Sequence, residues 1–145
     1  MPEPWFLTLQ RWGVGSGEEQ TWPVVSVDTV IEAVRALANE QNAMLTLSHD
    51  PEAYEYWLGV NASDGQFYVS VQLDENTALD LVGNPQATGM VPYVRGGQLV
   101  SHPRKYLITL DQAVAAATEF YHTGTINPTK AAWERQGPGS AWDEV

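Results

Sequence analysis

Two stretches of the chain repeat apolar residues at the spacing of an α-helix. Between residues 27 and 38, and again between 110 and 121, apolar side chains recur every three or four positions, which places them along one stripe of a helix. Thr109 and Gln112 begin the second stretch with the spacing of a capping box, and Gly124 follows it where a left-handed residue can end a helix. The pattern therefore predicts two amphipathic helices, each of which needs another element to cover its apolar face.

Elsewhere apolar and polar residues alternate, which is typical of strands with one buried face. The alternation predicts strands over residues 5–12, 43–49, 54–61, 66–73, 89–95 and 98–101, with a further short strand over 79–82. A hairpin-type turn at Asp64-Gly65 joins the strands over 54–61 and 66–73, and another at Gly96-Gly97 joins those over 89–95 and 98–101. The glycine-rich stretch over 13–20 matches no phosphate-binding pattern, and we expect a mobile loop there. The predicted fold class is α+β, a mostly antiparallel sheet of about five or six strands with two amphipathic helices packed on it.

The hairpin predicted over residues 54–73 carries aromatic side chains on both of its faces. One face is apolar, whereas the other presents Trp57 and Tyr68 among polar residues such as Glu55. Two interpretations stay open. Either a helix or loop covers these aromatic rings, or they form an exposed anchor for a binding partner beside nearby acids.

Length and charge narrow the range of functions. A chain of 145 residues, 43% of them apolar, is long enough for one domain with a substantial core. We expect that domain over residues 1–136, followed by a flexible acidic tail over 137–145. The net charge is −11, and all of this excess lies in residues 1–80, which hold thirteen acids and two bases. An acidic surface repels nucleic acid and anionic lipid and attracts a basic partner.

The sequence offers no constellation for catalysis or metal binding. It has no cysteine, and its three histidines, His49, His102 and His122, have no partner at metal-ligand spacing. We therefore expect no metal, no cofactor and no enzymatic activity. The N-terminus lacks the regions of a signal peptide, and no apolar run is long enough to span a membrane, so we expect a cytoplasmic protein.

The second predicted helix and the residues after it resemble a known family. Phe120, Tyr121 and Gly124 end the helix, and Pro128 and Trp133 follow. This pattern is similar to the C-terminal end of the first-numbered family of immunity proteins in bacterial polymorphic toxin systems. The order of elements resembles that family over most of the chain. The resemblance implies a protein that binds and neutralises a cognate toxin.

The toxins associated with that family include nucleic-acid deaminases. The resemblance thus implies stoichiometric occlusion of the active site of a nucleic-acid-targeting, deaminase-like toxin with a basic surface. Deaminases of this kind hold zinc with histidine and cysteine and use a catalytic glutamate. Because this chain has no cysteine, it is not itself such a deaminase. We expect a protein partner and no direct binding of nucleic acid or membrane.

Charge and alternation, rather than the resemblance, indicate which residues contact that partner. They are acids in predicted turns together with one aromatic residue: Asp50, Glu52, Glu55, Trp57, Asp64, Asp74 and Glu75. An alternative function stays open at this point. The chain could be a small ligand-binding domain or enzyme with a pocket between sheet and helices, lined by Trp57, Tyr68 and the histidines.

Overall fold

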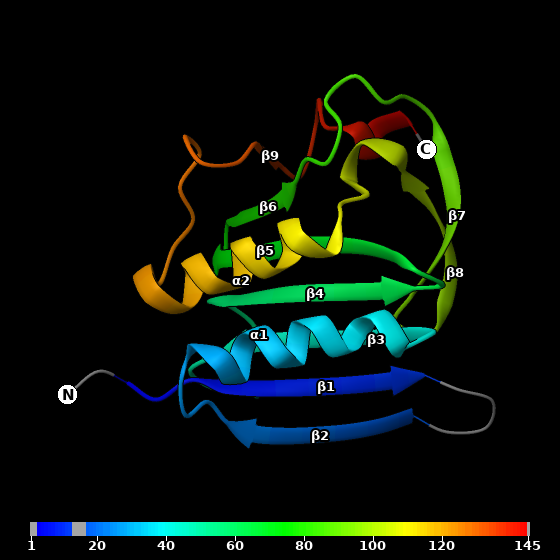
Figure 1. Ribbon diagram of the computed structural model, residues 1–145. Coiled ribbons are helices and arrows are strands. Elements are labelled where there is room, and N and C mark those ends of the chain that lie inside the picture. The colour runs from blue at the N-terminus through cyan, green and yellow to red at the C-terminus, as the bar shows by residue number, and fades with distance from the viewer. Residues whose placement is uncertain (1–2, 13–16, 145) are drawn as a thin grey trace.

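One antiparallel sheet of seven strands forms the centre of the molecule (Figure 1). The structure is a computed structural model that describes residues 3–12 and 17–144. The strands, in their spatial order, are β2 (Gly17–Pro23), β1 (Phe6–Trp12), β3 (Asn42–Ser48), β4 (Trp57–Ser63), β5 (Gln66–Asp74), β6 (Thr77–Leu81) and β9 (Trp133–Arg135). Every pair of neighbours in this order is antiparallel.

Two helices lie side by side on one face of this sheet, α1 (Val27–Ala36) and α2 (Leu110–Thr123) (Figure 1). The ends of α2 are those that the sequence predicts. The Thr109 hydroxyl accepts a hydrogen bond from the Gln112 backbone N–H at 3.1 Å, and the Thr109 N–H donates to the Gln112 side chain at 2.9 Å. Gly124 ends the helix with a φ of 71°, in the left-handed region that favours glycine.

The main core lies between the helices and the sheet. Alternate strand residues point into it, among them Leu45, Leu58 and Val69, each 2% exposed or less. Val30 and Phe120 face them from the two helices and are fully buried. Full burial of a large apolar side chain contributes roughly 1.5–3 kcal/mol, so this layer is the main source of stability.

A second, smaller core lies on the opposite face of the sheet. A separate hairpin, formed by β7 (Met90–Arg95) and β8 (Gln98–Pro103), packs across one end of β3 and β4 (Figure 1). Tyr93 of the hairpin and Tyr106 of the short helix η2 (Arg104–Tyr106) are buried with Tyr68 of the sheet. The hairpin covers only part of this face and leaves the rest of it open.

The predicted fold class is confirmed, but two strands were not predicted. β2 begins inside the stretch where we expected a mobile loop, and its polar residues pair with β1 along the full strand. Pairing with a neighbour therefore overrides the weak strand propensity of Gly-Glu-Glu-Gln. β9 has three residues, too few for an alternating pattern, and pairs with β6. Residues 13–16 of the expected loop lie outside the described part of the chain.

β4 also begins later than predicted, at Trp57. Tyr56 adopts a φ of 62°, which interrupts the extended chain at that point. The Tyr56 hydroxyl donates to the Gly124 carbonyl at 2.8 Å and so ties the loop before β4 to the end of α2.

The segment over 137–144, where we expected a flexible tail, contacts the smaller core. It contains the short helix η3 (Ala141–Glu144), Ser140 is buried, and Trp142 packs on the smaller core. The amplitude of its motion in solution stays a prediction. None of the described helices is long and apolar enough to cross a membrane.

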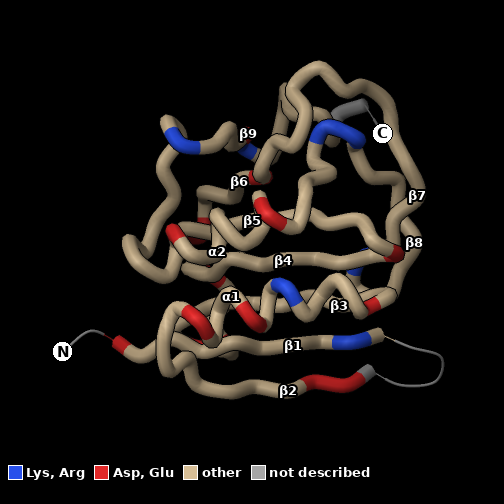
Figure 2. The backbone as a smooth tube through the Cα atoms, viewed as in Figure 1, with Lys and Arg blue, Asp and Glu red and all other residues tan. Residues whose placement is uncertain are grey.

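The charge asymmetry of the sequence is also an asymmetry in space. Figure 2 shows acidic positions along α1 and at the start of β2, and basic positions at η2 and β9 on the other side of the molecule. The acid-rich first part of the chain therefore produces an acid-rich part of the surface.

Candidate binding surface on the open face of the sheet

The uncovered part of the sheet's second face is hollowed into a pocket of about 540 Å³, which we call the sheet pocket. Strand register places Gln10, Met44, Asn61 and Tyr68 in one row across β1, β3, β4 and β5. The hairpin tip and the C-terminal segment form its walls. The lining residues are Gln10, Trp12, Met44, Trp57, Asn61, Tyr68, Ser70, Arg95, Gly96, Gln136, Gly137 and Trp142.

Trp57 lies at one end of the sheet pocket and is half-buried. Its indole N–H donates to the Tyr54 carbonyl at 3.1 Å. Its ring lies close to Gly59, where an added Cβ would come within 3.1 Å of the ring and 2.5 Å of the Met44 methyl. Gly59 therefore leaves the space that the Trp57 and Met44 side chains occupy across the sheet.

Tyr68 differs from Trp57 although both lie on this face, as the alternation predicts. It is 3% exposed and covered by the hairpin and the C-terminal segment. Burial raises the pKa of Tyr68 well above its ordinary value, and the Asp80 carboxylate raises it further, so its hydroxyl stays protonated and donates to Asp80. Of these two aromatic residues, Tyr68 is therefore covered and Trp57 is accessible.

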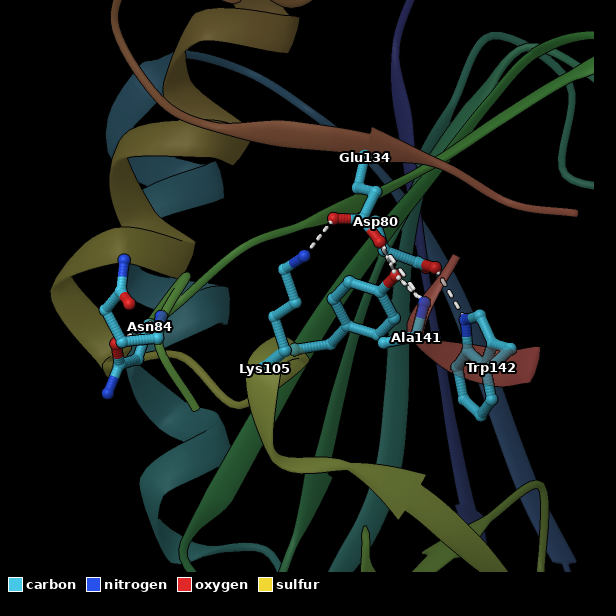
Figure 3. Close-up of polar contacts among 8 residues, drawn as sticks. Asp80, Asn84, Lys105, Glu134, Ala141 and Trp142 are labelled. Carbon is cyan, nitrogen blue, oxygen red and sulfur yellow. Dashed lines mark hydrogen bonds and ion pairs between the residues drawn. The ribbon is translucent and has the colours of Figure 1, made fainter. Parts of the chain in front are cut away.

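A fully buried carboxylate, that of Asp80 on β6, joins the C-terminal segment to the sheet (Figure 3). Besides the Tyr68 hydroxyl it accepts the Gln136 side-chain amide at 2.9 Å and the Trp142 indole N–H at 2.7 Å. Burial raises the pKa of Asp80, and these three donors oppose that rise. The network holds Trp142 in the wall of the sheet pocket.

A second carboxylate, that of Glu134 on β9, holds the same segment from the other side (Figure 3). It pairs with Lys105 Nζ at 2.5 Å and accepts the Tyr106 hydroxyl at 2.6 Å and the Ala141 N–H at 3.2 Å. Burial opposes the charge of Glu134, but the hydrogen bonds from Lys105 and Tyr106 prevail and lower its pKa. The wall of the sheet pocket is therefore a fixed polar assembly.

Five of the seven predicted contact residues gather at one end of the sheet, in the loop before β4 and the turn between β5 and β6. We call this group the acidic edge: Asp50, Glu52, Glu55, Asp74 and Glu75. The pairing of Trp57 with Gln72 brings the loop and the turn together. Glu55 and Glu75 line one shallow cavity with the almost fully exposed Tyr54.

The acids of this edge have two roles. Asp50 accepts the Glu52 backbone N–H at 3.0 Å, and Asp74 accepts the Asn76 N–H at 2.8 Å, so each holds its own turn. The bond from Asn76 lowers the pKa of Asp74. The exposed carboxylates of Glu52, Glu55 and Glu75 make no hydrogen bond or ion pair with any side chain that the structure describes, and they are available to a partner.

The remaining two predicted residues lie apart from each other. Trp57 follows the acidic edge directly and joins it to the sheet pocket. Asp64 sits in the β4–β5 turn at the opposite end of these strands, with a φ of 53°. The structure thus brings six of the seven residues together and leaves Asp64 distant.

The pocket suggested as an alternative, with Trp57 and Tyr68 between sheet and helices, does not form, because both residues lie on the other face. A separate groove of about 560 Å³ lies between α2 and the β6–β9 edge of the sheet. His122 and Trp133 line it, but Trp57 and Tyr68 do not. Trp133 is half-buried and packs on the main core.

The histidines are separated in the structure. His49 stacks on Trp5, His122 is exposed at the end of α2, and His102 is fully buried beside Tyr93. Burial lowers the pKa of His102 to about 4, so the ring is neutral at pH 7. The described residues contain no group of three or more potential metal ligands.

Of the residues that line the sheet pocket, the sequence indicated only Trp57 and Tyr68. The large side chains that it missed include Trp12, Met44, Arg95 and Trp142. The alternation of the first strand could have found Trp12, which continues the row of Thr8 and Gln10. No local pattern indicated Arg95 or Trp142, because their position depends on how the hairpin and the C-terminal segment fold back.

Comparison with models of protein families finds one that matches most of the chain. The family model described as Immunity protein Imm1 matches residues 18–135, which run from β2 to β9 and include both helices and the β7–β8 hairpin. No curated protein matches the chain. The match covers well over half of the sequence, and the chain belongs to the Imm1 family of immunity proteins.

Proposed function

We propose that this protein neutralises a nucleic-acid-targeting, deaminase-like toxin by covering the active site of that toxin in a stoichiometric complex in the cytoplasm of the producing cell. Immunity proteins are non-enzymatic inhibitors, so the action depends on binding alone. The observation that carries the proposal is the junction of the acidic edge with the sheet pocket at Trp57. It combines unpaired charge with accessible aromatic surface on one continuous region.

Electrostatics supports a basic partner. An enzyme that handles nucleic acid needs a basic surface to hold phosphates. Glu52, Glu55 and Glu75 are exposed and unpaired within the described residues, so they can compete for such a surface and accelerate encounter with it.

Durable inhibition also requires slow dissociation, which charge at the rim does not supply. Interfaces of about 1,600 Å² usually depend on a few aromatic or arginine anchors at their centre. Trp57 is suited to this role, since it is half-buried between the acidic edge and the sheet pocket and its indole N–H already donates to the Tyr54 carbonyl. A fixed ring loses little conformational freedom on binding.

The other predicted contacts contribute less in this arrangement. Asp50 and Asp74 hold their turns and add charge, whereas Asp64 contributes only as a distal contact at the far end of the strands. Reversal of Asp64 should therefore change toxin affinity less than reversal of Glu55.

The experiment uses the product of the gene directly upstream of this one as the candidate toxin. We would first ask whether the two proteins co-purify as a one-to-one complex that survives moderate salt and protects the host cell. Association rates are then compared for a Glu52, Glu55, Glu75→Lys triple variant and for a control that reverses Asp28, Glu32 and Asp111, three exposed acids on the helices.

Both triple variants change the net charge equally. We expect the acidic-edge variant to associate about tenfold more slowly and with weaker salt dependence, and the helix variant to stay close to wild type. Equal association rates for the two variants would refute the role of the acidic edge. A failure of the wild-type protein to bind the toxin would refute the proposed function as a whole.

A further inference from the structure

The sheet pocket contains one cation, Arg95, which has no ion-pair partner among the described side chains. Its guanidinium carbon lies 4.7 Å from the centre of the Trp142 ring and 6.0 Å from that of Tyr68. The other half-buried cations of the described chain do have partners: Arg11 pairs with Glu40 at 2.8 Å, and Lys105 pairs with Glu134 at 2.5 Å. The Arg95 guanidinium is therefore packed against aromatic rings in a concave site but forms no ion pair there.

The nearest buried carboxylate does not satisfy Arg95. The oxygens of Asp80 accept hydrogen bonds from Tyr68, Gln136 and Trp142, and no Asp80 oxygen lies within 4.0 Å of the guanidinium nitrogens. Arg95 therefore acts on Asp80 only over a longer distance, as a positive charge that helps to oppose the rise that burial causes in the pKa of Asp80. The guanidinium carbon lies over the Trp142 ring, and no hydrogen bond or ion pair of the Arg95 side chain is formed with the described residues. Guanidinium N–H groups prefer two oxygens of one carboxylate.

The surroundings favour an anion that arrives on a protein side chain. The volume of about 540 Å³ and the aromatic walls of Trp12, Trp57 and Trp142 suit a protruding segment of a partner, and Gln10 adds an amide donor. The pocket lies next to the acidic edge, so a partner that covers Trp57 also covers Arg95. A molecule of net charge −11 has little general attraction for free anions, which favours a carboxylate carried by a protein that the acidic edge has already bound.

We infer that the sheet pocket receives an aspartate or glutamate side chain of the toxin, which forms a bidentate ion pair with Arg95. This inference rests on the proposed function. It adds one positive charge to a contact surface that is otherwise acidic. The acidic edge attracts a mainly basic surface, and Arg95 requires one acid within that surface. A basic protein without an acid at this position would leave Arg95 covered and unpaired, which disfavours wrong partners.

The test compares toxin binding by Arg95→Gln, Arg95→Lys and the control Arg104→Gln. Arg104 is an exposed cation on the neighbouring helix η2 and lies outside the lining of the sheet pocket. We expect Arg95→Gln to raise the dissociation constant about 30-fold, mainly through faster dissociation, and Arg104→Gln to change it less than about threefold. Arg95→Lys should recover part of the loss, since it keeps the charge without the planar fork.

A charge swap identifies the toxin residue. Arg95→Glu should weaken binding more than Arg95→Gln, and one acidic residue of the toxin, when changed to arginine, should restore the affinity of Arg95→Glu. Urea unfolding of each variant shows that the fold is retained. If Arg95→Gln binds the toxin as tightly as Arg104→Gln while the acidic-edge variant still associates slowly, this inference fails and the proposed function stands.

A free anion is the other possible occupant of the site. Titration of the protein with inorganic phosphate or acetate, followed by the intrinsic fluorescence of the tryptophans, tests this directly. Saturable binding that Arg95→Gln abolishes, together with unchanged toxin affinity of that variant, would assign the pocket to a small anion and overturn the inference.

Discussion

The two faces of the central sheet differ in kind. The face under α1 and α2 is covered by a continuous apolar core, in which Val30, Val69 and Phe120 are fully buried. The opposite face is covered only in part, and its buried side chains include polar ones such as Asp80 and His102. One face therefore supplies most of the stability, and the other exposes a structured, polar and aromatic pocket.

This division allows a binding surface to be built on one face without weakening the main core on the other. The walls of the sheet pocket are held by buried hydrogen bonds rather than by flexible loops, as the bonds from Gln136 and Trp142 to Asp80 show. A preorganised site loses less freedom on binding. Because the main core lies on the far side, substitutions in the pocket and substitutions in the core should have separable effects.

The largest expected effect is a loss of stability from the helix-covered face. Phe120→Ala removes a fully buried ring in contact with Trp5 and Tyr56, so the free energy of unfolding should fall by about 3–5 kcal/mol. Urea unfolding measures this, and the folded fraction should still bind toxin with wild-type affinity. Loss of less than about 1 kcal/mol would contradict the assignment of this face as the main core.

The partly covered face should be sensitive to acid. Its buried His102 has a pKa lowered to about 4 from an ordinary 6.5, so between these values the unfolded chain binds a proton that the folded chain does not. The free energy of unfolding should therefore fall as pH decreases from 6.5 to 4, by about 3 kcal/mol from this residue.

His102→Phe serves as the matched variant, since the site is lined by Tyr68, Tyr93 and Trp142 and accepts an aromatic ring. Urea unfolding at several pH values should show a shallower decrease for this variant than for wild type. The raised pKa of Asp80 acts in the opposite direction in both proteins and cancels in the comparison. Parallel pH profiles would show that His102 is not protected from protonation.

Trp57→Ala should separate binding from stability. The ring is half-buried and lies outside the main core, so we expect a loss of about 1 kcal/mol in unfolding free energy at most. Toxin affinity should fall by about 2 kcal/mol, or roughly 30-fold, if Trp57 is the central anchor. Calorimetry or surface plasmon resonance measures the affinity. A loss of stability with no loss of affinity would show that the interface lies elsewhere.

Asp64 gives the smallest expected effect. Asp64→Lys would place a positive charge at the end of β4 opposite to the acidic edge, and we expect less than about threefold change in association rate. Glu55→Lys, a single reversal of the same size within the acidic edge, is the control. A stronger effect at Asp64 than at Glu55 would show that the toxin docks at the opposite end of these strands from the acidic edge.

The sequence predicted the elements that have a strong local signal. The caps of α2 at Thr109 and Gly124, the Asp64-Gly65 turn and the faces of β4 and β5 all follow from short-range patterns, and each is present. Acids in neighbouring turns and the alternation of β4 indicated the acidic edge and Trp57, and the structure brings them together. Their contact with a partner stays a prediction.

What the sequence did not reveal depends on contacts between distant segments. β9 forms only because β6 offers it a partner, and Arg95 and Trp142 meet only because the hairpin and the C-terminal segment fold over the same part of the sheet. No local pattern indicates the burial of Asp80, since its three donors come from residues 68, 136 and 142. Such assemblies have no local periodicity to detect.

The most direct test of the division between the faces is amide hydrogen exchange of the protein alone and in complex with the toxin. We predict new protection in the loop before β4, in the β5–β6 turn and at the tip of the β7–β8 hairpin, with α1 and α2 unchanged. Protection concentrated on α1 and α2, with the acidic edge and the hairpin tip unchanged, would contradict the assignment of the sheet's second face as the toxin-binding surface.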